Sequence, residues 1–152
     1  MTSVLFVCLG NICRSPLAEG LFVHQVAKAG LSHQFSADSA GTGDWHAGEL
    51  PDPRSRAVAA KHGVLLPSLA RQITPRDLVS HGYILCMDRQ NLANVAALGP
   101  VQGELLLLGQ FDPQGVHEVP DPYWGTDADF EAVFQQISRS TSAFLAHLTG
   151  AR

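Results

Sequence analysis

Charged residues are scarce in this chain, and basic residues are fewer than acidic ones. Of the 152 residues, 16% are charged and only 10 are Lys or Arg, which gives a net charge of −4. A protein that binds duplex nucleic acid normally carries a basic stripe, and anionic membrane surfaces also attract basic clusters. The composition therefore argues against nucleic acid and against a membrane surface as partners.

Cysteine is also scarce, with three residues at Cys8, Cys13 and Cys86. This odd, low number does not form the disulfide framework of a small secreted protein, and it fits reduced thiols in the cytoplasm. Neither the cysteines nor the seven histidines show the paired spacing of a zinc site. We therefore predict no metal and no other cofactor.

Long hydrophobic runs are absent. The apolar run at residues 4–7 is far too short for the core of a signal peptide or for a membrane span. A hydrophobic content of 45% in 152 residues suits one domain with its own core. We expect a soluble cytoplasmic protein in which residues 1–152 form a single domain.

Short apolar runs alternate with helical patterns along the chain. Strands are predicted at 4–7, 35–40, 83–87 and 105–108, and helices at 16–29, 53–62, 77–80, 89–98 and 127–148. Ser15 is predicted to cap the first helix, Asp88 to cap the helix at 89–98, and residues 109–125 to form a long loop. The alternation predicts a doubly wound α/β fold with a four-stranded parallel sheet and helices on both faces. Ligands of such sheets bind at the carboxyl ends of the strands.

The segment after the first predicted strand has the residues of a phosphate-transfer site. Cys8 follows the strand, and Arg14 comes six residues later, where a helix begins. Backbone N–H groups of such a turn form an anion-binding nest and, with the helix dipole, favour a thiolate at Cys8. Arg14 can present two parallel donors to phosphate oxygens, and Ser15 can hydrogen-bond the sulfur. A thiolate aimed at phosphorus is a nucleophile poised for in-line attack.

The Cys-x5-Arg spacing alone is a weak motif, and a structural cysteine near a surface arginine is the alternative interpretation. The setting of the motif makes it more specific, because a buried strand precedes it, Gly10 and Asn11 suit a tight turn, and Ser15-Pro16 suits a helix start. A nucleotide-binding loop fits less well, because GxxxxGK[ST] is absent.

Phosphocysteine chemistry also needs a proton donor for the leaving oxygen. Asp121 is a candidate, since it lies in the long loop between two prolines that restrict the backbone. Tyr123 and Trp124 beside it could form the wall of a pocket for an aryl group. An Asp-Pro pair is commonly only a turn, so the residues by themselves leave the acid role open.

The sequence closely resembles the low-molecular-weight protein tyrosine phosphatases over essentially its whole length. The resemblance is carried by residues 4–16, 38–42, 70–74, 83–88 and 121–123. It implies hydrolysis of phosphotyrosine in proteins, and of small aryl phosphates, through a phosphocysteine and without a metal. The nucleophile would be Cys8, the residue that holds the phosphate Arg14, and the general acid Asp121.

The resemblance also implies supporting roles. A phosphate or similar oxyanion would be bound by a loop that includes Leu9, Gly10, Asn11, Ile12, Cys13 and Ser15. Asn11 would hold the shape of this loop, with Ser39 as a hydrogen-bond partner. Cys13 resembles the second thiol of the family, which could trap an oxidised Cys8 as a reversible disulfide.

Trp45 falls where the family has an aromatic residue that lines the substrate cleft, opposite Tyr123 and Trp124. Taken alone, Trp45 would more often be interpreted as an aromatic residue that anchors its loop. Many animal members have two adjacent tyrosines after Asp-Pro, and here the second is Trp124, which excludes phosphorylation at that position.

Three other functions have to be weighed. Thioredoxin-coupled arsenate reductases share this loop and a cysteine like Cys86, but they need a further cysteine soon afterwards, and this chain has none. Protein-arginine phosphatases tend to have Thr where this chain has Ile12, so Ile12 favours phosphotyrosine. A non-catalytic phosphate-binding module would be expected to lack Cys8 or Asp121. Cys86 is interpreted as a core residue.

Overall fold

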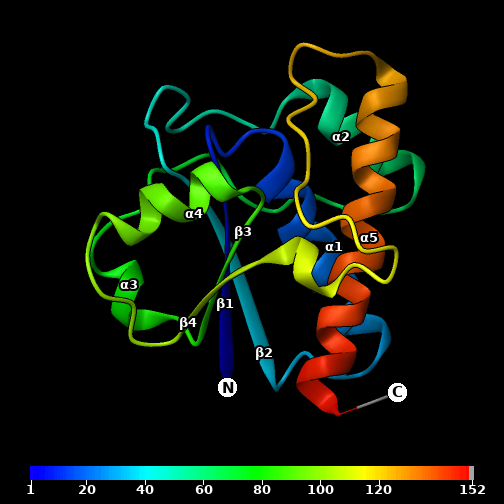
Figure 1. The fold of residues 1–152 in the computed structure, drawn as a ribbon. Coiled ribbons are helices and arrows are strands. Elements are labelled where there is room, and N and C mark those ends of the chain that lie inside the picture. The colour runs from blue at the N-terminus through cyan, green and yellow to red at the C-terminus, as the bar shows by residue number, and fades with distance from the viewer. Residues whose placement is uncertain (151–152) are drawn as a thin grey trace.

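Four parallel strands form one sheet in the computed structural model, which describes residues 1–150 (Figure 1). The strands are β1 (Thr2–Cys8), β2 (Phe35–Gly41), β3 (Tyr83–Cys86) and β4 (Glu104–Leu107). Their order in the sheet is β2-β1-β3-β4, and each neighbouring pair is parallel. The predicted four-stranded parallel sheet is therefore confirmed.

Helices cover both faces of the sheet, as predicted. The helical elements are α1 (Arg14–Lys28), α2 (Pro53–Lys61), α3 (Asp77–Ser80), α4 (Arg89–Ala96), the 3-10 helix η1 (Leu108–Phe111) and α5 (Asp127–Thr149). One core contains residues of α1, α2 and α5, and a second, smaller core contains residues of α3 and α4. Figure 1 shows these two groups on opposite sides of the strands. None of the helices within residues 1–150 has the length and apolar character needed to cross a membrane.

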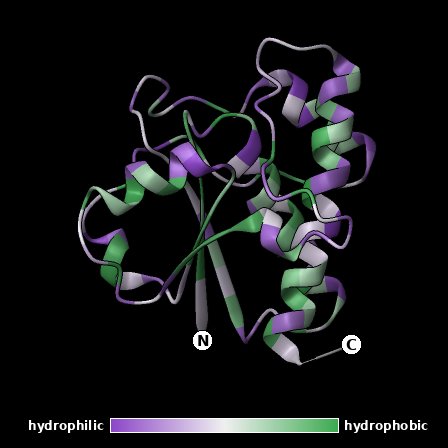
Figure 2. Cartoon of the chain, in the orientation of Figure 1, coloured by the Kyte–Doolittle hydropathy of each residue, from purple (hydrophilic) through white to green (hydrophobic). Residues whose placement is uncertain are grey.

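The central strand β1 is buried on both faces. Val4 and Phe6 point into the core with α1 and α5, and Leu5 and Val7 point into the core with α3 and α4. Side chains of a strand alternate between its two faces, so a strand covered on both sides needs a continuous apolar run. Figure 2 shows apolar residues within β1 and in bands along α5. The packing fixes the carboxyl end of β1, where Cys8 lies.

Two local predictions were wrong. Helix α1 begins at Arg14 and its N-cap is Cys13, so Ser15 does not cap the helix; its hydroxyl instead contacts the sulfur of Cys8. The predicted loop at 109–125 is not loop throughout, because η1 occupies its first residues together with residue 108. This turn forms because the side chain of Gln110 accepts a hydrogen bond of 2.8 Å from the N–H of Leu107.

A partly buried ion pair fixes the segment between β2 and α3. Arg71 donates two hydrogen bonds of 2.9 Å to the carboxylate of Asp77, which also accepts the N–H of Thr74 at 2.8 Å. Burial by itself would raise the pKa of Asp77, but the hydrogen bonds from Arg71 and Thr74 outweigh it and hold that pKa well below its usual range. The folded protein therefore prefers the charged carboxylate.

We predict that Asp77→Asn lowers the free energy of unfolding at neutral pH by about 2 kcal/mol, a value reduced for solvent screening because Arg71 is one-third exposed. The stabilisation by a carboxylate with a depressed pKa is present above its ordinary pKa of about 4 and is lost as the pH falls toward the folded-state value. The difference between wild type and variant, measured by urea unfolding, should therefore shrink below pH 4. A difference independent of pH would contradict this account, and Asp44→Asn, at an exposed position, is the control.

Candidate active site

Residues 8–15, the phosphate-binding loop, connect β1 to α1. The carbonyls of Cys8, Leu9 and Ile12 accept hydrogen bonds of 2.8–3.0 Å from the backbone of neighbouring loops. In a trans peptide the N–H points opposite to the C=O, so the N–H groups of Leu9, Gly10 and Cys13 point to the enclosed side of the loop. Several inward N–H groups next to a helix N-terminus form an anion-binding site.

Asn11 gives the loop its turn. It is the only residue other than glycine with a positive φ, 57°, in the part of the chain that the structure describes, and asparagine tolerates this conformation. Its Nδ2 donates to Ser15 Oγ at 2.7 Å and to Ser39 Oγ at 3.0 Å, and its Oδ1 accepts the N–H of Arg71 at 2.9 Å. The structure therefore brings Asn11 and Ser39 together, as the resemblance implied.

The hydrogen-bond network extends to a buried carboxyl that the sequence analysis missed. Glu19 is 3% exposed, and its two oxygens accept hydrogen bonds of 2.6 Å from Ser39 and from Ser68. Burial raises the pKa of Glu19, and the two serine hydroxyls offset this only in part. The available signal was an acidic residue on the otherwise apolar side of the first helix.

Ser15 contacts the sulfur of Cys8. The two atoms, Oγ and Sγ, lie 3.0 Å apart, and both residues are buried. Because the amide of Asn11 already donates to Ser15 Oγ, the hydroxyl hydrogen of Ser15 is free to point at Sγ. A donor in this position stabilises negative charge on the sulfur.

Arg14 is held by a carboxylate from the opposite side of the site. Its side chain is 3% exposed, and one terminal nitrogen donates to Asp88 Oδ2 at 2.7 Å and to the carbonyl of Val119 at 2.9 Å. The other terminal nitrogen lies 3.8 Å from Asp121 Oδ2. Burial opposes the charge of Arg14, but the negative groups at Cys8, Asp88 and Asp121 outweigh it and raise its pKa.

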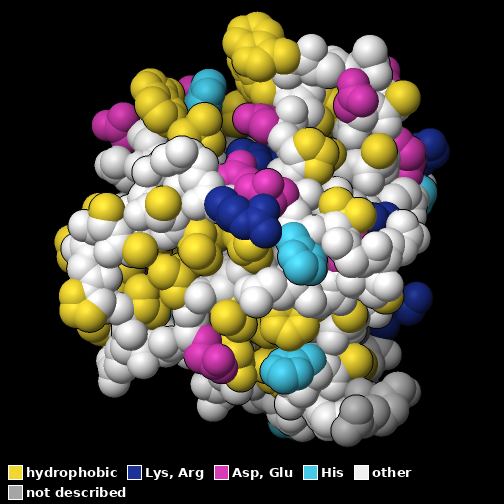
Figure 3. All heavy atoms as spheres, viewed as in Figure 1, with side chains coloured by type: hydrophobic (Ala, Val, Ile, Leu, Met, Phe, Trp, Pro, Cys, Tyr) yellow, Lys and Arg dark blue, Asp and Glu magenta, His cyan; other side chains and the backbone are white. Residues whose placement is uncertain are grey.

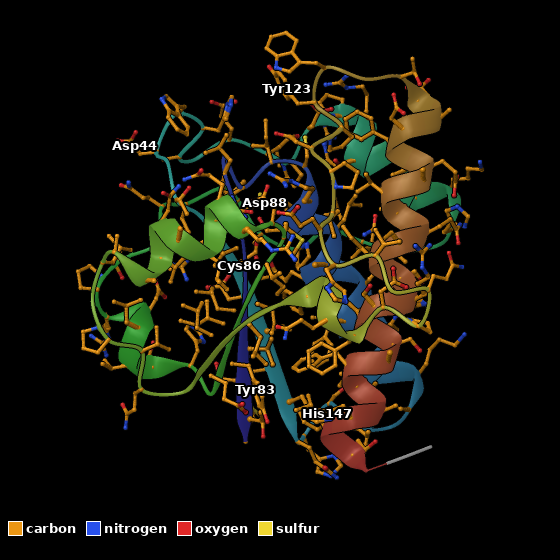
Figure 4. All side chains as sticks on the ribbon, in the orientation of Figure 1. Asp44, Tyr83, Cys86, Asp88, Tyr123 and His147 are labelled. Carbon is orange, nitrogen blue, oxygen red and sulfur yellow. The ribbon has the colours of Figure 1, made fainter. Side chains whose placement is uncertain are left out.

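Asp88 was predicted only as a helix cap, and it has both functions. Its Oδ1 accepts the N–H of Asn91 at 2.8 Å and caps α4, while Oδ2 binds Arg14. Figure 4 shows Asp88 at the start of α4, just beyond Cys86 at the end of β3. A carboxylate directly after a strand end was the sequence signal, and its partner could not be inferred from spacing.

A cavity of about 210 Å³ opens above the phosphate-binding loop. It is lined by residues 8–10 and 12–14, by Asp121 and His46, and by the aromatic rim, Trp45, Tyr123 and Trp124. The predicted site residues thus meet at one cavity, except Asn11, Ser15 and Ser39, which are buried behind it. His46 was not predicted. Figure 3 shows apolar side chains at the top of the molecule, the end to which the strands point.

Asp121 stands at the open side of this cavity. Its side chain is 43% exposed, and its Oδ1 accepts the N–H of Tyr123 at 3.1 Å. The rings of Tyr123 and Trp124 pack edge to face with centroids 4.8 Å apart, and Trp124 is 92% exposed. A partly exposed carboxyl beside a held guanidinium can exchange a proton with a bound group or with water.

The two other cysteines are buried in surroundings that disfavour the thiolate. Burial, together with the nearby charges of Asp52 and Cys8, raises the pKa of Cys13 to about 12. Cys86 is fully buried in β3, and burial raises its pKa as well. Among residues 1–150, no three His, Cys, Asp or Glu side chains gather as a metal site would require.

Comparisons with known proteins agree with this geometry. The sequence model of the family described as low molecular weight phosphotyrosine protein phosphatase matches residues 3–152. The pig protein of that name is 46% identical over 147 residues, covering 94% of this chain and 93% of its own. A protein tyrosine phosphatase from Entamoeba histolytica, solved with Hepes in its active site, superimposes with a TM-score of 0.95 at 31% identity, covering 99% and 98% of the two chains. A Drosophila arginine phosphatase gives 0.90 at 35%, covering 97% and 98%.

We predict that Asp88→Asn weakens binding of inorganic phosphate about tenfold, because the variant keeps the cap oxygen but loses the charge that orients Arg14. Isothermal titration of the folded variant measures the dissociation constant. Asn91→Ala, which removes the N3 side chain of the same capping box, is the control for a damaged helix start. Unchanged phosphate affinity in Asp88→Asn would rule out the orienting role.

Proposed function

The chain belongs to the low molecular weight phosphotyrosine protein phosphatase family, and we propose which of its residues carry out the hydrolysis of phosphotyrosine. Cys8 is the nucleophile, Arg14 holds the phosphate, and Asp121 is the general acid. The observation that supports this assignment is that all three side chains line one cavity at the carboxyl end of β1, next to the inward N–H groups of the phosphate-binding loop.

Phosphate binding comes first. The inward N–H groups of the loop and the N-terminus of α1 attract the dianion, and Arg14 offers it the guanidinium nitrogens not used by Asp88. Because Asp88 and Val119 already fix the guanidinium, little side-chain entropy is lost on binding. The bound phosphorus then faces the Cys8 sulfur.

Phosphoryl transfer follows. The Cys8 thiolate attacks phosphorus, and the S–P bond forms as the P–O bond to the tyrosine oxygen breaks. The protonated carboxyl of Asp121 gives its proton to that oxygen, so tyrosine leaves as a neutral phenol. The products of this step are a phosphocysteine and an Asp121 carboxylate.

Water completes the cycle. The Asp121 carboxylate takes a proton from a water molecule whose oxygen attacks phosphorus, and the S–P bond breaks. The hydroxyl of Ser15, 3.0 Å from Sγ, stabilises the thiolate that is released. Inorganic phosphate leaves, and Asp121 is protonated again for the next turnover.

The walls of the cavity favour an aryl phosphate. The aromatic rim surrounds the opening, and Ile12 presents an apolar side chain inside it. A flat tyrosine ring suits such walls, whereas the guanidinium of phosphoarginine would find fewer polar partners. Arginine phosphatase activity is the second candidate function, and the similarity to the Drosophila arginine phosphatase is what favours it.

The class of substrate and the cellular compartment are inferred from individual residues. We propose phosphotyrosine-containing proteins as substrates, because Trp45 and Trp124 expose aromatic surface at the cavity mouth that a bound polypeptide would cover. Three free thiols are compatible with the reducing cytoplasm. The redox role of Cys13 stays a prediction.

We expect the protein to hydrolyse phosphotyrosine peptides faster than phosphoarginine peptides, and chelators to leave the rate unchanged. Cys8→Ser should lower the rate by about 10⁴ or more, because a hydroxyl is a far weaker nucleophile at this site.

Ile12→Thr should raise kcat/KM for phosphoarginine about tenfold relative to phosphotyrosine. Phosphate release from both peptides measures all three. A wild type that prefers phosphoarginine would reverse the assignment of substrate.

A further inference from the structure

We propose that Arg54 positions the general acid: its guanidinium holds the ring of Tyr123 and thereby sets where the Asp121 carboxyl stands over the cavity. This inference rests on the proposed function, in which Asp121 protonates the leaving group. Arg54 does not line the cavity itself, so it acts through the residues that it contacts.

One side of Arg54 is tied to the phosphate-binding loop. Its Nε donates to Asp52 Oδ1 at 3.1 Å and a terminal nitrogen donates to Asp52 Oδ2 at 3.0 Å, which is a two-point contact that only a planar guanidinium makes. Asp52 is 8% exposed, and its own N–H donates to the carbonyl of Ile12 at 2.8 Å. The guanidinium therefore has a fixed place relative to the loop that binds phosphate.

The other side of Arg54 contacts two aromatic rings. Its Cζ lies 4.4 Å from the ring centroid of Phe130 and 5.5 Å from that of Tyr123. Phe130, in the first turn of α5, is 1% exposed and belongs to the core, so it is a rigid support. Cation–π attraction then holds the Tyr123 ring against an arginine that both the loop and the core keep in place.

Tyr123 transmits this position to the acid. Its N–H donates to Asp121 Oδ1 at 3.1 Å, and the residue between them is Pro122, whose ring restricts the backbone. The segment from residue 112 to residue 126 contains no helix or strand that could fix the carboxyl. Figure 4 shows Tyr123 in this segment, which precedes α5 in the chain. Its ring lies close to α2, the helix that carries Arg54. A displaced Tyr123 ring would therefore displace the carboxyl.

The basicity of the leaving group separates this role from a merely structural one. An acid matters most when the leaving oxygen is strongly basic, as in tyrosine, and little when the oxygen leaves readily without a proton, as in 2,4-dinitrophenol. A residue that positions the acid should affect kcat/KM in the same graded way. A residue that only stabilises the fold or the phosphate site should affect both substrates alike.

The test compares kcat/KM for a phosphotyrosine peptide and for 2,4-dinitrophenyl phosphate. In Arg54→Lys, which keeps a cation for Asp52 but loses the planar fork, we expect a loss of about 5-fold on phosphotyrosine and less than about 2-fold on dinitrophenyl phosphate. Arg56→Lys is the matched control, because Arg56 lies on the same helix and donates to the Pro51 carbonyl, and both substrates should be unaffected.

Asp121→Asn separates failure of this inference from failure of the proposed function. If Asp121→Asn loses activity on phosphotyrosine far more than on dinitrophenyl phosphate, the acid assignment stands, and an equal loss on both substrates in Arg54→Lys overturns the role of Arg54. If Asp121→Asn affects both substrates equally, the acid assignment fails and the inference fails with it.

A second variant keeps the test decisive if Arg54→Lys folds poorly. Tyr123→Leu removes the ring and leaves the Arg54–Asp52 contact in place. Because this ring also lines the cavity, kcat/KM should fall for both substrates, but the loss on phosphotyrosine should exceed the loss on dinitrophenyl phosphate several-fold. In the double variant the loss on phosphotyrosine should be smaller than the product of the two single losses, because both changes break one contact. Full multiplicative losses would overturn the proposal.

Discussion

The turn at Asn11 is the constraint on which the whole site depends. A positive φ at this residue reverses the chain within the phosphate-binding loop, and its amide holds the turn through Ser15, Ser39 and the backbone of Arg71. Only in this shape do the loop N–H groups converge on one point. The same amide also frees the hydroxyl hydrogen of Ser15 for the Cys8 sulfur, so the shape of the loop and the hydrogen bond to the sulfur both depend on a single side chain.

Buried charge is balanced around this loop by pairs from distant segments. Arg14 is nearly inaccessible, and it is compensated by Asp88 beyond β3 and by Asp121 ahead of α5. An isolated buried guanidinium would be costly, so these carboxylates allow a permanent cation to remain beside the sulfur. Asp88 caps α4, and Asp121 lies in the segment from residue 112 to residue 126. The second face of the sheet and the C-terminal part of the chain therefore both contribute to the site.

The sheet and the residues of the proposed chemistry could be predicted from the sequence, but the contacts between residues distant in the sequence could not. Apolar runs such as 4–7 predicted the strands because burial on both faces requires them, and Cys8 and Arg14 were visible because their spacing is local. Four residues were missed or were given only part of their role, because each contacts residues that are distant in the sequence and that only the fold brings near. They are Asp88, Glu19, His46 and Arg54. Ser15 was misread as a cap because Ser-Pro suits a helix start, whereas here the hydroxyl points to the sulfur.

The location of the two tryptophans has a practical consequence. The chain has only Trp45 and Trp124, and both stand on the rim of the cavity with most of their surface in solvent. The intrinsic ultraviolet emission of tryptophan in this protein therefore originates entirely at the mouth of its cleft, with no contribution from the core. Occupancy of the cleft can be followed optically on the unlabelled protein, and quenching by a ligand reports a local event rather than a change of the whole fold.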